Sequence, residues 1–569
     1  MNRPGINNAP DIQDFMRPAA TVMDVSRLGC LYPYPLSFMR SLLRQVISQN
    51  WQIKPAIISL NDQGYGHVVY EVVTPRAIFS YVIFAKYLAP ERRSDRVIAE
   101  DWDMTVTFCE GRVDDKRFAE LLANVPLQEK GRVDTSCFVL SRANKSVRNF
   151  EAVVSALAAG HQPNLDAMAK VGYLYRTTAV YGSGKFGMAD WEKVKTRWPD
   201  FSCPFDAEMF SCWMIRHFSL FQADYVAARR SPKTAVKMDE KIKRYVGIGN
   251  ATGLGMAPYL INHPLLINNW IEVRETALAR VLSQAVPDDT SRGHFICLAL
   301  KAMQHLGEIS TDNAEQNKLN ANAGADLERA LAWFQSQTIS AWRELTEYAR
   351  SNLGVEAQEL INVLLLELYP DMIANLKDTL SVDEVYSLQA NMRASDLKRL
   401  IETHYDWALN IDYTDPKTQG VFWYRSEEKM EPRLGQRFEE PGSENEMLLG
   451  IGWYVCESYE SLCQFIEKHG PDINTARFVF AHPEHRYITR RMQTMAKTRY
   501  GEIRVNAIDL DVLPIHLLRC KLSFFGVGKF DPRSRMWVRN TMFQGAPLVS
   551  DIGTDIGDTW CFPIRPMVE

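Results

Sequence analysis

The sequence predicts a multidomain α+β protein, and three observations lead to this class. The chain has 569 residues, which is more than a single hydrophobic core usually serves. Short runs rich in β-branched and aromatic residues dominate up to about residue 143, whereas residues 144–409 show mostly helical spacing of apolar side chains. Residues 410–569 mix both patterns. We therefore expect a loose leader at residues 1–20, an α+β domain with an antiparallel sheet at residues 21–143, a large helical middle and a C-terminal α/β or α+β domain.

The first domain is expected to begin with a helix and to continue with strands. Residues 35–51 place apolar side chains at helical spacing. The turn Asn61-Asp62-Gln63-Gly64 separates the first two strand-like runs, and such short connections favour hairpins and an antiparallel sheet. One or two helices after Asp114 would cover one face of that sheet. The strand-like runs are residues 53–60, 67–73, 78–88 and 96–109.

The middle domain shows long helical patterns, and the C-terminal domain shows shorter, mixed ones. Pro204 fits the first position of a helix. Residues 310–326 are polar and rich in Asn and Ala, and they predict an exposed linker. The expected helices of the two domains are residues 204–228, 264–286, 327–353 and 459–469. The expected C-terminal strands are residues 421–424, 478–480 and 503–505.

Composition and charge exclude several classes of protein. The formal net charge of −4 argues against a nucleic-acid-binding surface. The N-terminus lacks the apolar segment of a secretory signal, and the most apolar run, residues 77–88, is too short to span a bilayer. The ten cysteines include no Cys-x-x-Cys pair, which predicts reduced thiols and no disulfide. We expect a cytoplasmic protein that binds neither nucleic acid nor membrane.

A glycine-rich stretch at residues 247–258 is the first candidate for a ligand site. It has neither the spacing of a Walker A loop nor a preceding strand suited to a dinucleotide turn. Glycines allow positive φ, so successive N–H groups beside a helix N-terminus could bind an anion. The alternative is a tight loop that lets two helices pack closely. The short polar side chains in the stretch favour ligand contact. The candidate residues are Gly249, Asn250, Thr252, Gly253 and Gly255.

A second glycine turn contains a lysine and follows a polar, strand-like run. Ser183 and Lys185 lie in Gly182-Ser183-Gly184-Lys185, after Arg176. Lysine can hold a phosphate or carboxylate as a point charge, although an ordinary surface turn explains the same residues. The segment from Tyr181 to Phe186 resembles Phe525-Gly-Val-Gly-Lys529-Phe530, but so few identities do not indicate a duplication.

Histidines and carboxylates supply the remaining candidates. His263 follows the glycine-rich stretch and could act as a general acid or base, or simply bond the backbone at a helix end. His217 lies on an apolar helix face, which indicates a core histidine. His482 and His485 could bind zinc or iron with a third ligand, although Pro483 disfavours a regular helical face. Asp101 and Asp103 fit either an acid/base pair or a charged edge strand.

Together these features predict an enzyme acting on a small anionic metabolite that bears a carboxylate or phosphate. The two glycine segments, Arg176 and Lys185 would bind the anion, and His263 would move a proton. The reaction class and any cofactor are not specified by the sequence, which also leaves self-association open. Two alternatives come from other classes: a noncatalytic scaffold or partner-binding protein, and a metal-dependent oxidoreductase or hydrolase that uses His482 and His485.

Overall fold

The chain forms two compact units, each assembled from distant segments. We call the first the sheet unit, made of Cys30–Gly253, Ala285–Asp378 and Lys521–Glu569, and the second the helix-rich unit, made of Met1–Gly29, Leu254–Gln284 and Thr379–Cys520. The computed structural model describes residues 12–28, 32, 34–92, 101–126, 136–177, 195–203, 205–253, 264–284, 288–373, 376–380, 385–414, 422–425, 432–435, 451–502, 523, 525–532, 537–554 and 560–567.

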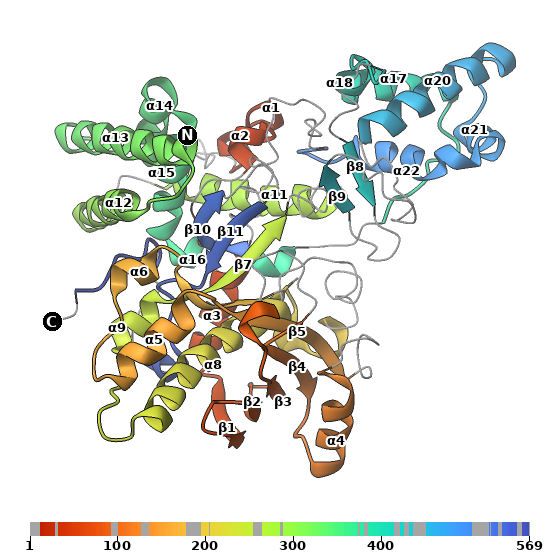
Figure 1. Cartoon of the computed structure of the whole chain (residues 1–569). Helices are drawn as coiled ribbons and strands as arrows, with labels where there is room; N and C mark the ends of the chain where they lie inside the picture. Colours follow the sequence, from red (N-terminus) through yellow and green to blue (C-terminus); the bar gives the residue numbers. More distant parts are fainter. Residues whose placement is uncertain are drawn as a thin grey trace, which may run out of the picture. The chain divides into compact units, whose positions relative to one another are not determined.

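A nine-stranded mixed sheet is the centre of the sheet unit (Figure 1). Its spatial order is β1-β2-β3-β4-β5-β6-β7-β11-β10. Neighbouring strands are antiparallel except β6 and β7, which are parallel. The predicted α+β class and the antiparallel N-terminal sheet are therefore confirmed. The strands are β1 Gln52–Leu60, β2 Gly66–Val73, β3 Ile78–Ala85, β4 Met104–Glu110, β5 Cys137–Lys145, β6 Tyr173–Thr177, β7 Gly247–Gly253, β10 Val527–Pro532 and β11 Trp537–Met542.

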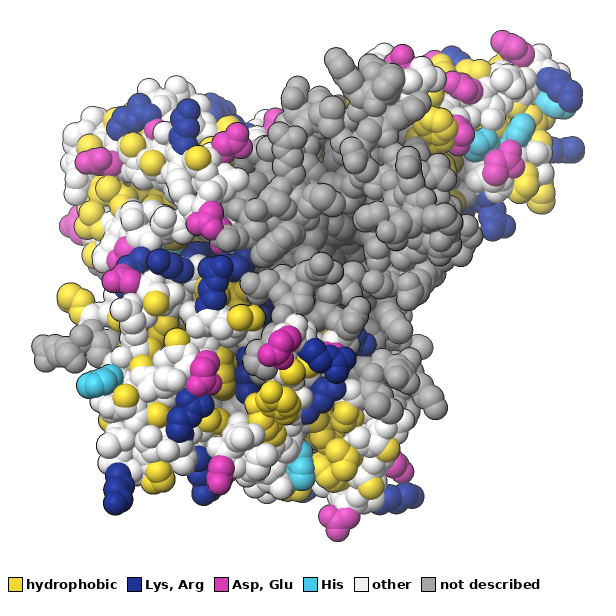
Figure 2. Space-filling view, in the orientation of Figure 1, with side chains coloured by type: hydrophobic (Ala, Val, Ile, Leu, Met, Phe, Trp, Pro, Cys, Tyr) yellow, Lys and Arg dark blue, Asp and Glu magenta, His cyan; other side chains and the backbone are white. Residues whose placement is uncertain are grey.

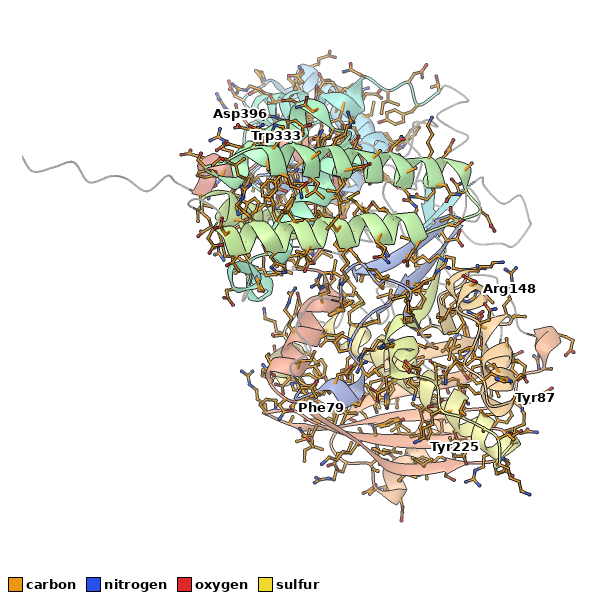
Figure 3. All side chains as sticks on the ribbon, turned by 90° about the vertical axis from the view of Figure 1, so that its left-hand side faces the viewer. Phe79, Tyr87, Arg148, Tyr225, Trp333 and Asp396 are labelled. Carbon is orange, nitrogen blue, oxygen red and sulfur yellow. The ribbon has the colours of Figure 1, made fainter. Side chains whose placement is uncertain are left out.

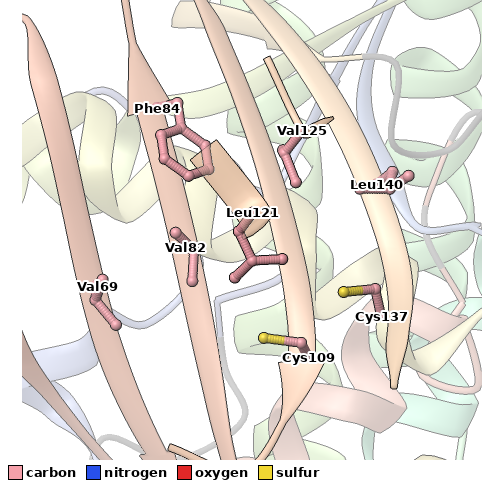
Figure 4. Packing of buried hydrophobic residues seen from close by; sticks show 8 residues of the cluster. All are labelled: Val69, Val82, Phe84, Cys109, Leu121, Val125, Cys137 and Leu140. Carbon is pink, nitrogen blue, oxygen red and sulfur yellow. The ribbon is translucent and has the colours of Figure 1, made fainter. Parts of the chain in front are cut away.

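Helices cover both faces of the first strands of this sheet. On one face α8 (Asp206–Arg230) packs through aromatic rings, with Phe108 stacked on Phe210 at 4.8 Å between ring centroids. On the other face α4 (Asp115–Asn124) contributes Leu121 to a buried cluster with Val82 and Cys109 (Figure 4). Alternate residues of a strand point to opposite faces, so the runs of apolar residues in β3 and β4 reflect burial on both sides.

The sheet unit contains nine further α-helices among its described residues. They are α3 Phe38–Ser48, α5 Asn149–Ala158, α6 Leu165–Ala169, α9 Glu240–Tyr245, α12 Asp289–Glu308, α13 Ala314–Ser336, α14 Trp342–Asn352, α15 Val355–Glu367 and α16 Pro370–Ile373. The predicted helix at residues 327–353 is divided, because α13 ends at Ser336 and α14 begins at Trp342.

The predicted linker at residues 310–326 is wrong, because most of it belongs to α13. Asn313 caps this helix by accepting a hydrogen bond from the backbone N–H of Gln316, at 2.9 Å. Gln316 and Asn320 are buried and bond to each other, at 2.9 Å between side chains. A polar composition therefore conceals a helix whose amides pair inside the fold, since buried polar groups are stable when they are hydrogen-bonded.

In the helix-rich unit, α17, α18, α20, α21 and α22 pack together, and β8 pairs with β9 in a separate two-stranded sheet. The predicted strand at residues 478–480 is wrong, because these residues lie within α21 and pack with its helical period. Among the described helices, none is both long and apolar enough to cross a membrane. The elements are α1 Ala19–Val22, α2 Val25–Leu28, α11 Pro264–Leu282, α17 Ala394–His404, α18 Asp406–Leu409, β8 Phe422–Arg425, β9 Pro432–Gly435, α20 Ile451–His469, α21 Thr475–Ala481 and α22 Arg486–Met495.

The glycine-rich stretch is a strand up to Gly253, and the interpretation of this part as a loop is wrong. Gly247 and Gly249 lie in β7 without positive φ. A Cβ at Gly247 would lie 2.4 Å from the carbonyl oxygen of Met542, and one at Gly249 would lie 2.5 Å from the Tyr173 ring. These glycines are explained by the close approach of neighbouring strands and not by a turn.

Gly249→Ala should destabilise the sheet unit by about 1–3 kcal/mol, because the added methyl group must displace the buried Tyr173 ring. Gly293→Ala is the matched control: it lies in α12 with nothing within 4 Å of the added Cβ. This control should be stabilising by about 0.5–1 kcal/mol, since alanine favours helix more than glycine does. Urea unfolding of both variants measures the difference. Equal stability of the two variants would contradict the packing explanation.

Candidate functional site

A polar pocket of about 450 Å³ lies in the sheet unit. Its walls come from β10, β11, α6, the connection between α12 and α13, and the C-terminal segment. Figure 2 shows Lys and Arg side chains gathered on this face, between α6 and α12 of Figure 1. We call it the polar pocket. Its lining residues are Arg148, Asp166, Ala169, Lys170, Tyr245, His305, Glu308, Ile309, Ser310, Thr311, Asp312, Lys529, Asp531, Arg539, Gln544, Pro563 and Arg565.

Lys529 is a buried cation of the polar pocket. Its buried Nζ donates to the carbonyl oxygens of Ala169, at 2.6 Å, and Lys170, at 3.3 Å. Carbonyl oxygens can only accept, so these contacts are charge-assisted hydrogen bonds donated by the ammonium group. These carbonyl groups lie at the C-terminal end of α6, so the hydrogen bonds hold the ammonium group of Lys529 against this helix.

Arg539 and Asp531 form an ion pair in the lining of the polar pocket. They face each other across the β10–β11 ladder, with Arg539 Nη1 3.8 Å from Asp531 Oδ2. Both side chains are buried. Opposite charges directly across an antiparallel pair stabilise the register, and here they also set a guanidinium beside Lys529.

The C-terminal segment contributes Arg565. Its backbone N–H donates to Glu308 Oε2 at 2.9 Å, and its Nη1 lies 2.6 Å from Asp166 Oδ1. Burial raises the pKa of Tyr245, and the positive charge and hydrogen bond of Arg565 partly oppose this rise. The tyrosine is therefore a neutral hydroxyl at neutral pH, able to donate or to accept a hydrogen bond.

His305 lines the polar pocket as a neutral imidazole. Burial lowers the pKa of His305 to about 4, so the ring is neutral at pH 7. Its Nδ1 lies 2.8 Å from the carbonyl oxygen of Pro563. A carbonyl can only accept, so Nδ1 holds the proton and Nε2 keeps its lone pair.

Two exposed cations complete the rim. Arg148 and Lys170 line the polar pocket, and among the described residues no carboxylate pairs with either of them. Figure 3 shows Arg148 on the side of the sheet that faces α12 and α13. The lining holds five Lys or Arg residues and four Asp or Glu residues, and two of those carboxylates face Arg539 and Arg565. Three cations and two carboxylates remain in the lining, so its charge favours binding of an anion over a cation.

Those predicted anion-site residues that the structure describes are not lining residues of this pocket. Gly249 in β7 pairs with Thr541 in β11, which in turn pairs with Lys529 in β10. Gly249 and Lys529 therefore lie on the same face of the sheet, but the Tyr173 ring covers Gly249. Asn250 is buried opposite Asn540, on the other face. The backbones of Thr252 and Gly253 pair with β11, and Arg176 pairs with Asn144 in β5. Gly255, His263, Ser183 and Lys185 lie outside the described residues.

Sequence analysis therefore did not identify the polar pocket, although one of its observations involves a lining residue. Lys529 belongs to the segment that resembles the glycine turn around Lys185. The other cations lie up to about 400 positions apart in the sequence, and no local pattern relates them.

Two histidines and a glutamate form a second cluster, in the helix-rich unit. His482 Nδ1 lies 3.3 Å from Glu484 Oε1, and His485 Nε2 lies 4.0 Å from the same oxygen. Their nearest ligand-type atoms all lie within 4.8 Å of one another, so the set could hold a metal ion. We call these residues the His–Glu–His cluster.

The other sequence candidates have structural partners. His217 is half-buried: its ring packs against Tyr70 at 5.4 Å, and burial lowers its pKa to about 4. Asp103 is buried and accepts from the backbone N–H of Lys145 at 2.9 Å, whereas Asp101 pairs with Arg92. The two carboxylates thus serve separate contacts.

Comparison with models of known protein families, with curated proteins and with solved structures finds no match to this chain. We therefore infer function from the residues of the polar pocket themselves.

Proposed function

We propose that the chain is an enzyme that binds a small anionic metabolite, bearing a carboxylate or phosphate, in the polar pocket. The observation that carries this proposal is the convergence of five Lys and Arg residues on one cavity of about 450 Å³. That volume is typical of sites for small molecules, which use a few placed polar groups for orientation.

The lining residues divide into anchoring and attracting groups. Lys529 and Arg539 are buried and fixed by the sheet, so they would contact the anion without losing much side-chain entropy. Arg148 and Lys170 are exposed, so they would attract the anion and contact it at the rim. His305 Nε2 and the Tyr245 hydroxyl would accept or donate hydrogen bonds to hydroxyl groups of the same ligand.

This arrangement supports an enzyme over a scaffold. A scaffold is expected to expose a contiguous apolar patch, whereas an enzyme is expected to enclose convergent polar groups. The polar pocket has the second character, with cations, carboxylates, an imidazole and a phenol on one cavity.

The double variant Arg148→Met/Lys170→Met should lower the affinity for citrate and for inorganic phosphate about tenfold, a loss of about 1.4 kcal/mol. Each exposed charge is expected to contribute about half of this value, and the effect should shrink at high salt. Titration calorimetry of the intact chain measures the affinity. Neither side chain supports another group through an ion pair in the described structure, so unfolding free energy should change by less than about 0.5 kcal/mol.

Lys233→Met is the matched control, since Lys233 is exposed in the same unit and does not line the polar pocket. It should bind both anions as the wild type does. Wild-type affinity in the double variant would contradict the proposal, and so would the absence of citrate and phosphate binding to the wild type. The latter result would favour the scaffold.

A further inference from the structure

We propose that the His–Glu–His cluster, His482 with Glu484 and His485, binds a divalent transition-metal ion of the zinc type. This site belongs to the helix-rich unit and is independent of the polar pocket. Two imidazole nitrogens and one carboxylate oxygen are a donor set that zinc sites with an open coordination position use.

The distances from Glu484 Oε1 to the two ring nitrogens are close to those around a coordinated ion, and the whole set lies within 4.8 Å. Ligand bonds of about 2.0–2.2 Å place neighbouring ligand atoms of a tetrahedral zinc about 3.3–3.5 Å apart. The separation of 3.3 Å between His482 Nδ1 and Glu484 Oε1 already satisfies this value. His485 Nε2, at 4.0 Å from the same oxygen, requires a movement of about half an ångström, which side-chain rotation supplies.

The backbone explains why the two histidines converge. A 3₁₀ turn, η7, covers Pro483–His485 between the end of α21 and the start of α22. The N–H of His485 donates to the carbonyl oxygen of His482 at 3.1 Å and closes this turn. Residues three apart are eclipsed in 3₁₀ geometry, so both rings lie on one side. Pro483, which argues against an α-helical face, is compatible with the first position of this turn.

Aromatic packing holds the two rings in place. Phe478 is buried; its ring lies 6.0 Å from that of His485 at an interplanar angle of 9°, and 5.3 Å from that of His482. Phe465 of α20 contacts the His482 ring edge-on, at 6.0 Å. The two rings therefore lose little side-chain entropy on metal binding, which is the advantage of pre-organised ligands.

The cluster combines a buried ligand with two accessible ones. The side chain of His485 is 10% exposed, whereas those of His482 and Glu484 are 33% and 60% exposed. An ion can therefore enter from solvent, and water can complete its coordination. Ser461 Oγ of α20 lies 2.9 Å from His485 Nε2. A metal ion would replace this hydroxyl as the partner of Nε2 and would leave it beside the site.

The chemistry of the donors selects the class of ion. Imidazole suits Zn²⁺, Cu²⁺, Fe²⁺ and Ni²⁺, whereas Ca²⁺ and Mg²⁺ prefer sets of oxygen ligands. We name Zn²⁺ as the ion to test, with Co²⁺ as its coloured substitute, because zinc accepts two histidines and one carboxylate with water as a further ligand.

The test is Zn²⁺ binding by the full chain. After incubation with Zn²⁺ and extensive dialysis, metal analysis should find one equivalent per chain. Co²⁺ should give visible absorption bands that Zn²⁺ abolishes. Glu484→Gln, His482→Gln and His485→Gln should each lower Zn²⁺ affinity tenfold or more. Glu484 is an exposed residue, so its variant tests the site even where a histidine variant fails to fold.

His404→Gln is the matched control, because His404 is an exposed histidine of the same unit outside the cluster. It should bind Zn²⁺ as the wild type does. Less than half an equivalent of Zn²⁺ on the wild type, or unchanged affinity in the Glu484→Gln variant, would overturn the proposal. The pocket double variant should bind Zn²⁺ normally, so failure of one proposal is distinguishable from failure of the other.

Discussion

Arg216→Lys is expected to destabilise the sheet unit by about 3–5 kcal/mol, since several buried carbonyl groups lose their donors together. Arg216 lies on α8 and is 1% exposed. Its guanidinium joins the end of α9, the start of β7 and the segment after β11. The guanidinium donates five hydrogen bonds of 2.6–3.0 Å, to the carbonyl oxygens of Val246, Pro547, Lys243, Arg244 and Ala546.

Lysine cannot replace this arrangement, because its three donors sit on one atom and cannot follow the planar fork of arginine. Burial lowers the pKa of Arg216 to about 9, which still leaves the group charged at pH 7. The charge is stabilised by the carbonyl dipoles, so the substitution loses both the hydrogen bonds and the compensation for desolvation.

The measurement is urea unfolding followed by hydrogen exchange of peptides from residues 206–253, which separates this unit from the other. Arg229→Lys is the control on the same helix. Arg229 is exposed, and its ion pair with Asp62 is long, at 3.8 Å between Nη1 and Oδ1. It should change stability by less than about 0.5 kcal/mol. A similar small change for Arg216→Lys would show that the carbonyl cluster is satisfied without the guanidinium.

Glu502→Gln is expected to destabilise the helix-rich unit by about 3–5 kcal/mol, since it removes the charge partner of a buried arginine. Arg491 of α22 donates to Glu502 from Nε at 2.8 Å and from Nη2 at 2.7 Å. The side chains are 2% and 5% exposed. Burial by itself lowers the pKa of Arg491, but the Glu502 carboxylate raises this pKa by more. The net shift is upward, so the arginine stays charged. Glutamine offers one neutral acceptor where the guanidinium needs a bidentate anion.

The double variant Arg491→Met/Glu502→Leu should recover most of this loss, because it removes both charges from the interior. Glu402→Gln is the matched control: Glu402 pairs with Lys398 on the exposed face of α17 in the same unit. Its effect should stay below about 0.5 kcal/mol. Thermal denaturation measures the differences, and limited proteolysis identifies which unit opens. A double variant less stable than Glu502→Gln would contradict the account of an uncompensated buried charge.

The two proposed sites rest on different kinds of assembly. The polar pocket needs α6, α12 and the C-terminal segment together, so it forms only in the folded sheet unit. The His–Glu–His cluster lies within four consecutive residues, and its geometry follows from one 3₁₀ turn packed on Phe478. Destabilising the sheet unit through Arg216 should therefore affect anion binding before it affects zinc binding.

Sequence alone determined the α+β class, the first hairpins and several helices. The turn at Asn61 to Gly64 joins β1 and β2 as predicted, and α3 and α8 follow the expected apolar periods. It also identified His482 and His485 as a pair of potential metal ligands close in sequence. These features depend on contacts within a few turns of the chain, where side-chain period and turn residues decide the conformation.

Only the tertiary structure decided what the glycines and the distant cations do. Gly249 resembles a loop residue by composition, but the Tyr173 ring of the adjacent strand occupies the space of its missing side chain. Residues 310–326 resemble a linker, but their amides pair inside the fold. Lys529, Arg539 and Arg565 meet Arg148 and Lys170 because β10 and β11 return to the sheet beside β7. Strand order of this kind is set by burial over long sequence separations, and no local pattern of residues records it.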